Sequence, residues 1–217
     1  MFTGLVQCVG RVGRIASLGG DRRFLIEVAE PGLDRVAVGD SIAVDGCCLT
    51  AVTAGGGAFE ADVSNESLSR TTLGELDVGS RVNLETALTL STPLGGHLVS
   101  GHVDGVGEVL ARRPDGRSER WRFRAPAELA RYIAEKGSIC VNGISLTVNV
   151  VDGAAFDVNV VPHTAAATNL GDLGPGARVN LEVDLVARYL ERLLQGRGAT
   201  GGGVDEALLA RAGFLKR

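Results

Sequence analysis

One string of this sequence occurs twice, almost unchanged. "GDSIAVDGCCLT" occupies residues 39–50 and "GSICVNGISLT" occupies residues 137–147. The offset between them is 97 residues (147 − 50), and the same offset superposes "RVNLE" at 81–85 on "RVNLE" at 178–182 without a gap. Solenoid repeats have periods of roughly 20 to 50 residues, so a period this long describes whole domains and not stacking units. The sequence therefore predicts two homologous domains in tandem.

The local pattern within each copy is that of short β-strands. Segments such as "SIAV" and "CCLTAVTA" in the first copy, and "SICV" and "SLTVNVV" in the second, partly alternate apolar and polar residues between turns containing "DG" or "NG". About six such strands in about 90 residues bury one face by forming a small barrel or sandwich, and a barrel also removes exposed edges. We predict an all-β fold of two antiparallel barrels, at 1–97 and 98–183.

The pattern changes after the second copy. Apolar residues of "DLVARYLERLLQ" at 184–195 fall at helical spacing, which predicts an amphipathic helix. Its apolar stripe suits docking on its own barrel or contact with another subunit, and we expect the segment 184–217 to serve association. We expect "GRGATGGG" at 196–203 to be a connector, followed by a short helix at 204–217.

Composition and charge exclude several classes of protein. With 26 acidic and 22 basic residues among 217, the net charge is −4 and the arginines are scattered, which argues against nucleic acid as a partner. No apolar run approaches the roughly 18 residues that cross a membrane, so we expect no membrane partner. Residues 1–5 already belong to the repeat, so no signal peptide precedes it. We therefore expect a cytoplasmic protein.

The four cysteines do not form a recognisable ligand set. Cys8, Cys47, Cys48 and Cys140 lack C-x-x-C spacing and a nearby histidine pair, so neither a zinc site nor a disulfide framework is expected. Cys8 and Cys140 lie in apolar strands and are expected to be small core residues. Neighbours on a strand point to opposite faces, so only one of Cys47 and Cys48 faces any given site.

The differences between the two copies are more informative than their similarity. Duplication by itself has a structural explanation, because fused copies fold well without sharing a ligand. Two equivalent sites with different reactive groups, however, suit a reaction between two copies of one substrate, in which one is deprotonated and the other is attacked. A lone histidine in a barrel is otherwise more often a structural hydrogen-bonding residue. The aligned pairs that differ are Leu5 and His102, Cys48 and Ser145, and Glu66 and His163.

Several motifs resemble the α-chain type of riboflavin synthase over essentially residues 1–195. They match in order and with the spacing of that family. The motifs are "MFTGLV" at the N-terminus, "GCCLT" at 46–50, "GGHLVSGHVDGVG" at 95–107, "KGSICVNGISLTVN" at 136–149 and "VPHTAAATNLG" at 161–171.

This resemblance implies a fold and an activity. It implies two six-stranded Greek-key barrels with a C-terminal helix, assembled as a homotrimer. It also implies a cofactor-free dismutation, with no metal, of two 6,7-dimethyl-8-ribityllumazine molecules. A four-carbon unit passes from one to the other, giving riboflavin and 5-amino-6-ribitylaminouracil. The active site is expected between the first barrel of one subunit and the second barrel of its neighbour. Association with lumazine synthase is left open, and the rival function is non-catalytic lumazine or flavin binding by an antenna-type relative.

Substrate-binding residues follow from the resemblance by position, and they fall into two sets related by the offset of 97. The first set, assigned to the first barrel, is Phe2, Gly4, Leu5, Val6, Cys48, Leu49, Thr50, Asp62, Val63, Ser64, Asn65, Glu66 and Ser67. The second set, assigned to the second barrel, is Gly101, His102, Val103, Lys136, Ser145, Leu146, Thr147, Asn159, Val160, Val161, Pro162, His163 and Thr164.

Catalytic roles are hypotheses within these sets. We expect His102 and Ser145 to assist removal of a proton from the acidic C7 methyl group of one lumazine. Cys48, with Ser41 and Thr50, is expected to act on the second lumazine, either directly or by positioning a nucleophile such as water. Phe2 is expected to order the N-terminal strand. His97 is expected to be structural.

Overall fold

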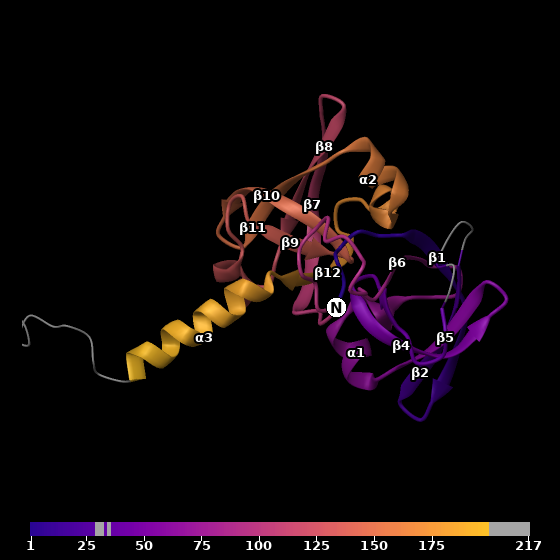
Figure 1. Ribbon diagram of the computed structural model, residues 1–217. Coiled ribbons are helices and arrows are strands. Elements are labelled where there is room, and N and C mark those ends of the chain that lie inside the picture. Colours follow the sequence, from indigo (N-terminus) through magenta and orange to yellow (C-terminus); the bar gives the residue numbers. More distant parts are fainter. Residues whose placement is uncertain (29–32, 34–35, 200–217) are drawn as a thin grey trace, which may run out of the picture. The chain divides into compact units, whose positions relative to one another are not determined.

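The computed structural model describes residues 1–199 except 29–32 and 34–35, with side chains described to residue 195. Its strands form two closed six-stranded antiparallel barrels, which Figure 1 colours from indigo to magenta and from magenta to orange. The first barrel has the order β1-β2-β5-β4-β3-β6 and the second the order β7-β8-β11-β10-β9-β12. Both orders are Greek keys. The predicted all-β fold is therefore confirmed.

The strands of the two barrels correspond one to one. Each strand of the second barrel begins and ends 97 residues after its counterpart, for example 105 − 8 and 115 − 18 for β7 and β1. The first barrel consists of β1 (Cys8–Leu18), β2 (Asp21–Glu27), β3 (Ser41–Val44), β4 (Cys47–Gly55), β5 (Ala58–Val63) and β6 (Arg81–Thr86). The second consists of β7 (Gly105–Asp115), β8 (Ser118–Arg124), β9 (Ser138–Val141), β10 (Ile144–Asp152), β11 (Ala155–Val160) and β12 (Arg178–Val183).

Short helices interrupt the strands at equivalent places. Ser64 begins the first of them by accepting a hydrogen bond from the backbone N–H of Ser67 at 3.1 Å, as an N-cap does. Such a cap favours the helical turn that follows it. The short helices are α1 (Asn65–Arg70) and η1 (Thr72–Glu75) in the first copy, and α2 (Pro162–Ala167) and η3 (Asn169–Asp172) in the second, while η2 (Ala127–Tyr132) precedes β9.

Turn chemistry explains the tightest hairpins. Asp45-Gly46 joins β3 to β4 and Asn142-Gly143 joins β9 to β10, with φ near +45° and +78° in each pair. Both central residues of such a turn need positive φ, which glycine, asparagine and aspartate adopt most readily. The two turns also touch, since a Cβ on Gly46 would lie 2.7 Å from the Gly143 nitrogen. Neither glycine can therefore be enlarged without moving the other turn.

The barrels have separate apolar cores. The core of the first barrel includes Phe24 and Phe59, which are both fully buried. The second contains an aromatic stack, in which Phe123 lies 5.9 Å from Trp121 and 5.5 Å from Phe156 between ring centroids. Burying each such ring contributes on the order of 2 kcal/mol, so these cores account for much of the stability of each barrel. Cys8 and Cys140 are buried, as expected.

A buried polar network connects the two barrels. Asn83 Nδ2 donates to the Asn142 carbonyl at 2.9 Å and to Asn169 Oδ1 at 2.8 Å. Asn169 Nδ2 in turn donates to Asp45 Oδ1 at 2.8 Å, and Asn180 Nδ2 donates to the Asp45 carbonyl at 2.8 Å. These polar groups are satisfied by one another, so burying them between the barrels fixes the relative register of the two copies.

Helix α3 (Leu185–Ala199) forms where the apolar periodicity predicts it. It continues through Gly196 and Gly198, so the expectation of a connector beginning at residue 196 is wrong. Each glycine costs about 1 kcal/mol relative to alanine, which weakens the last turn without ending the helix. The short helix expected at 204–217 lies outside the described residues. Within the described ranges, no helix is long and apolar enough to span a membrane.

Candidate active site

The segments that precede the two barrels cross each other. The Phe2 N–H donates to the Val99 carbonyl at 2.7 Å, and the Val99 N–H donates to the Phe2 carbonyl at 3.1 Å, in an antiparallel bridge. Residues 2 and 99 are themselves related by the offset of 97. A residue pairs with its own counterpart only where it lies beside the local twofold axis that relates the two copies. The two leading segments therefore run outwards from this axis in opposite directions.

Each leading segment continues onto a strand of the other barrel. The Ser145 N–H on β10 donates to the Gly4 carbonyl at 2.8 Å, and the Cys48 N–H on β4 donates to the Gly101 carbonyl at 2.8 Å. The sequence-based grouping placed Gly4 with the first barrel and Gly101 with the second, and it did not predict that each also bonds to the other barrel. The offset of 97 relates equivalent residues, but it cannot reveal that equivalent segments are exchanged.

The exchange makes two composite sites in one chain. β4 pairs with β5 so that Ala51 lies opposite Ala61, and β10 pairs with β11 so that Val148 lies opposite Val158. The end of β5 therefore lies beside the start of β4, and the end of β11 lies beside the start of β10. We name the Cys48 site from residues 48–50, 62–67 and 101–103. We name the Ser145 site from residues 145–147, 159–164 and 4–6.

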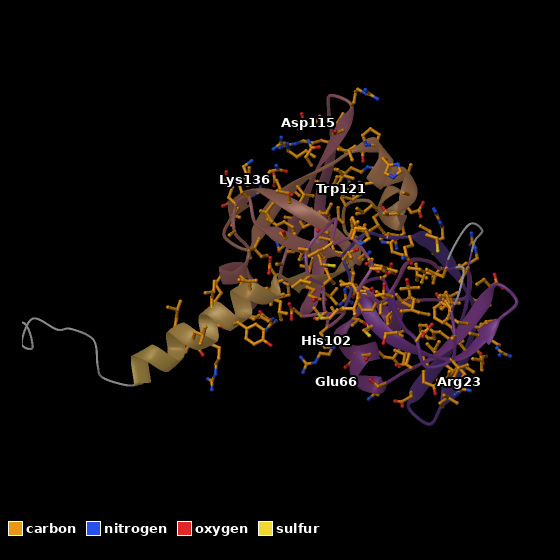
Figure 2. The ribbon with its side chains drawn as sticks, viewed as in Figure 1. Arg23, Glu66, His102, Asp115, Trp121 and Lys136 are labelled. Carbon is orange, nitrogen blue, oxygen red and sulfur yellow. The ribbon has the colours of Figure 1, made fainter. Side chains whose placement is uncertain are left out.

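The Cys48 site combines a thiol with an imidazole. Cys48 is half-buried and packs against Phe2, whereas Cys47 is buried and points into the barrel core. Burial, together with the neighbouring thiol and carboxylates, raises the pKa of Cys47 to about 12, so this thiol stays protonated and inert. The expectation that only one of the pair faces the site is confirmed. His102 lies on the surface (Figure 2), one residue after Gly101.

Ser41 and Thr50 lie opposite each other on neighbouring strands of the first barrel. They are paired residues of β3 and β4, and Thr50 is exposed. Directly opposite side chains on an antiparallel pair stand about 5 Å apart at Cβ, so the two hydroxyl groups share one face of the sheet. The fully buried Phe2 ring packs with Val99 beneath this region, which suits the ordering role expected for it.

The Ser145 site contains a histidine to which the sequence reasoning gave no chemical role. His97 Nδ1 lies 2.7 Å from Ser145 Oγ, and the backbone N–H of His97 donates to the Thr3 carbonyl. His97 is only 8% exposed, and its Nε2 has no hydrogen-bond partner among the described residues. Burial lowers the pKa of His97 and so favours the neutral imidazole, while the negative charge of Asp184 opposes this shift. None of the three aligned pairs singled out in the sequence includes residue 97, so that comparison did not point to this histidine.

His97 is therefore expected to orient the Ser145 hydroxyl. We expect His97→Ala to lower kcat for the family reaction about 10- to 100-fold. The variant lacks the imidazole that forms a hydrogen bond with Ser145 Oγ. His97→Asn keeps a hydrogen-bonding group near the Nδ1 position and should recover part of this loss. Steady-state kinetics of the single and double variants provide the measurement. Equal losses for His97→Ala in the presence and absence of Ser145 would contradict this role.

Other polar residues of the predicted sets already have protein partners. Arg23 holds Asp62 through two hydrogen bonds of 2.6 and 2.8 Å, and it keeps the pKa of Asp62 below its usual range. Glu66 pairs with Arg70 one turn further along α1. A ligand that uses either carboxylate has to share it with an arginine. Elsewhere, Asn159 Nδ2 donates to Asp115 Oδ2 at 3.2 Å, and the exposed Lys136 donates its backbone N–H to the Val148 carbonyl at 2.8 Å.

The chain matches a known domain twice. The lumazine binding domain model matches residues 3–87 and again residues 100–184, which together make up more than half of the chain. Among the described residues, no group of histidine, cysteine and carboxylate side chains could hold a metal ion. The fold and the two sites thus define a protein with two lumazine-binding domains.

Relatives narrow this class further. Riboflavin synthase of Photobacterium phosphoreum is 46% identical over 194 residues, covering 89% of each chain. Riboflavin synthase of Mycobacterium tuberculosis is 48% identical over 202 residues, covering 91% of this chain and all of the relative. The chain belongs to the riboflavin synthase family. Among solved structures, LumP complexed with riboflavin is 29% identical with a TM-score of 0.78, covering 84% of this chain and 99% of that one.

Proposed function

We propose that this protein converts two molecules of 6,7-dimethyl-8-ribityllumazine into riboflavin and 5-amino-6-ribitylaminouracil. The observation that carries this proposal is the pair of composite sites, equivalent by the offset of 97 but chemically different. In one, Cys48 is bonded to Gly101, the residue before His102, and in the other Ser145 contacts His97. A reaction in which two identical substrates meet different fates requires two related sites with different reactive groups. Holding both substrates together also removes much of the association entropy from the reactive step.

Non-catalytic lumazine or flavin binding is the rival function. Its support is the likeness to LumP, one structure of which is a complex with 6,7-dimethyl-8-(1'-D-ribityl) lumazine, at 28% identity and a TM-score of 0.76. Fold alone does not separate a carrier from an enzyme. The enzyme is favoured because relatives named riboflavin synthase reach 46% and 48% identity, and because Cys48, His102 and Ser145 are all present.

We assign the proton transfer from the lumazine C7 methyl group to His102 and Ser145. Within one chain these residues belong to different composite sites, so their cooperation requires the Cys48 site of one subunit to face the Ser145 site of its neighbour. Cys48, with Ser41 and Thr50, then acts on the second lumazine or positions water for it. The reaction needs no cofactor, because the two products together contain all the atoms of the two substrates.

His102→Ala and Ser145→Ala are expected to lower kcat by about 100-fold or more, as the loss of a general acid or base does. Because the two residues are proposed to act across a subunit boundary, mixing the two inactive variants should restore part of the activity. Remixing after mild dissociation, followed by a riboflavin assay, provides the measurement. Full turnover by either single variant would contradict the assignment.

We also propose that the protein is a homotrimer in the cytoplasm, with domains at 1–97, 98–183 and 184–217. Helix α3 supports association because Leu190 and Leu193 are more than half exposed along one stripe. Light scattering should give three times the chain mass of 22.5 kDa. Leu193→Asp is expected to reduce this mass, whereas Arg192→Ala, on an exposed position outside the stripe, should not. A wild-type monomer would refute the trimer.

Incubation of the purified protein with 6,7-dimethyl-8-ribityllumazine tests the proposed function. Substrate loss and riboflavin formation are followed together by absorbance and fluorescence. The expected result is two lumazines consumed per riboflavin, faster than in the absence of protein. Tight binding of lumazine without acceleration would instead establish the carrier.

A further inference from the structure

Two buried glutamates occupy equivalent positions at the base of the leading segments. Glu85 on β6 and Glu182 on β12 are related by the offset of 97 and are 4% and 5% exposed. Each faces away from its own barrel core, because Glu85 lies opposite Ala43 and Glu182 lies opposite Cys140 in the cluster around Phe2. Burying a carboxylate is costly unless hydrogen-bond donors surround it. Each glutamate must therefore have such donors close by.

Glu182 is surrounded by donors from the segment that carries His102. Its Oε1 accepts from the Ser100 N–H at 2.6 Å and from Ser100 Oγ at 2.7 Å, and its Oε2 accepts from the Gly101 N–H at 2.9 Å. Ser100 Oγ also accepts from the His102 N–H at 3.3 Å. Hydrogen bonds to a charged acceptor are roughly twice as strong as neutral ones. Three of them therefore hold this short segment firmly.

Glu85 makes the same contacts with the other leading segment. Its Oε1 accepts from the Thr3 N–H and Thr3 Oγ1, both at 2.6 Å, and its Oε2 accepts from the Gly4 N–H at 3.0 Å. The Leu5 N–H then donates to Thr3 Oγ1 at 3.1 Å. Repetition of all four contacts in both copies shows that this arrangement is built into the fold and is not a local accident.

We propose that Glu182 is a positioning residue for His102, and that Glu85 is the equivalent for the Leu5 segment of the Ser145 site. Gly101 is held on one side by Glu182 through its N–H and on the other by Cys48 through its carbonyl. With both peptide groups of Gly101 fixed and the His102 N–H bonded to Ser100 Oγ, the backbone of His102 is held in one position next to the Cys48 site. The catalytic meaning of this proposal rests on the proposed function.

The two acceptor oxygens of the Glu182 carboxylate are part of this role. Burial raises the pKa of Glu182, while the hydrogen bonds from Ser100 and Gly101 oppose the rise. A carboxylate has two acceptor oxygens, whereas a glutamine side chain has one acceptor and one donor group. In Glu182→Gln the amide NH₂ must therefore face one of the N–H donors of Ser100 or Gly101. One contact becomes repulsive, so the segment is displaced from its position beside β12.

Kinetics of Glu182→Gln test the positioning role. We expect kcat to fall about tenfold to a hundredfold with KM changed much less, as is typical when a group that orients a catalytic residue is lost. In a His102→Ala background the same substitution should have little further effect, because the residue it positions is gone. Glu85→Gln is the matched control, and its effect should multiply with that of His102→Ala.

A spectroscopic readout separates this proposal from the proposed function. The chain has three histidines, so ¹⁵N-histidine labelling gives three backbone amide signals, assigned by single histidine variants. Glu182→Gln is expected to shift the His102 signal. Glu85→Gln is expected to shift the His97 signal instead, since the His97 N–H donates to the Thr3 carbonyl. If the protein forms no riboflavin, this crossed pattern still tests the positioning.

Three results would overturn the proposal. These are wild-type kcat in Glu182→Gln, an equal loss in the wild-type and His102→Ala backgrounds, or an unshifted His102 signal. Should Glu182→Gln fail to fold, Ser100→Ala removes only the hydroxyl bridge between Glu182 and the His102 N–H. Its loss in kcat, expected at about threefold to tenfold, should likewise vanish in the His102→Ala background, and additivity there would refute the role.

Discussion

Replacing Gly101 with alanine is expected to lower kcat about 100-fold or more. The backbone of Gly101 has φ of +81°, and an added Cβ would lie 2.6 Å from the Cys48 Cβ and 2.8 Å from Phe2 Cε2. Both neighbours belong to packed structure, so the leading segment has to move and the hydrogen bond from the Cys48 N–H is lost. A displacement of about 1 Å at a catalytic group is enough for an effect of this size.

Gly116→Ala provides the matched control. Gly116 also has positive φ, at +63°, but no atom lies within 4 Å of an added Cβ in the β7–β8 turn. This substitution carries the backbone strain of about 1 kcal/mol without the collision, so it should lower stability slightly and leave kcat close to that of the wild type. Steady-state kinetics and thermal unfolding of both variants provide the comparison. Retention of more than about half of kcat by Gly101→Ala would refute the close approach to β4.

Asp45→Asn is expected to change how stability depends on pH. Burial raises the pKa of Asp45 to about 7 from a usual 3.8, opposed by hydrogen bonds from the Asn83 N–H and the Asn169 side chain. The folded state therefore binds this proton more tightly than the unfolded chain. Stability from this group is complete below about pH 4 and is lost as pH rises to about 7, on the order of 4 kcal/mol in all. The asparagine variant lacks this loss, so relative to the wild type it should gain stability between pH 4.5 and 8.

The other copy supplies the control. Asn142 occupies the equivalent position with φ of +46°, and its Oδ1 accepts from the Asn180 N–H at 2.7 Å as Asp45 Oδ1 accepts from the Asn83 N–H at 2.8 Å. An asparagine is thus known to fit this turn, and Asn142→Asp should create a second loss of stability with rising pH. Urea unfolding at one protein concentration measures both. If the difference in the free energy of unfolding between the wild type and Asp45→Asn stays constant from pH 4.5 to 8, the prediction is wrong.

Much of the fold could be predicted because its determinants are local. Alternation of apolar and polar residues predicted the strands, and Asp45-Gly46 and Asn142-Gly143 predicted tight turns between them. The offset of 97 then required both copies to adopt the same barrel. Helix α3 was predicted from periodicity, although its end was not, since glycines at 196 and 198 signal a break that the helix tolerates.

The candidate site was only partly predictable because its parts come from four distant stretches of chain. Cys48, His102 and Ser145 were identified from differences between the copies and from the family motifs. The contacts between the two copies were not predicted, because nothing local indicates that residues 2–6 cross onto β10 and residues 99–103 onto β4. His97 was missed as a chemical group because its contact with Ser145 joins residues 48 positions apart and no local pattern indicates it.

Two similar barrels, the helix after them and the residue types able to react could all be inferred from the order of the amino acids. Each of these follows from spacing along the chain, where neighbours in sequence are neighbours in space. Which groups meet became visible only in the folded chain. The exchange of leading segments, the contact between His97 and Ser145, and the burial of Glu85 and Glu182 all depend on packing between residues about 50 to 140 positions apart. Such contacts form because the two copies pack about a common axis, and a repeat in one dimension does not specify that packing.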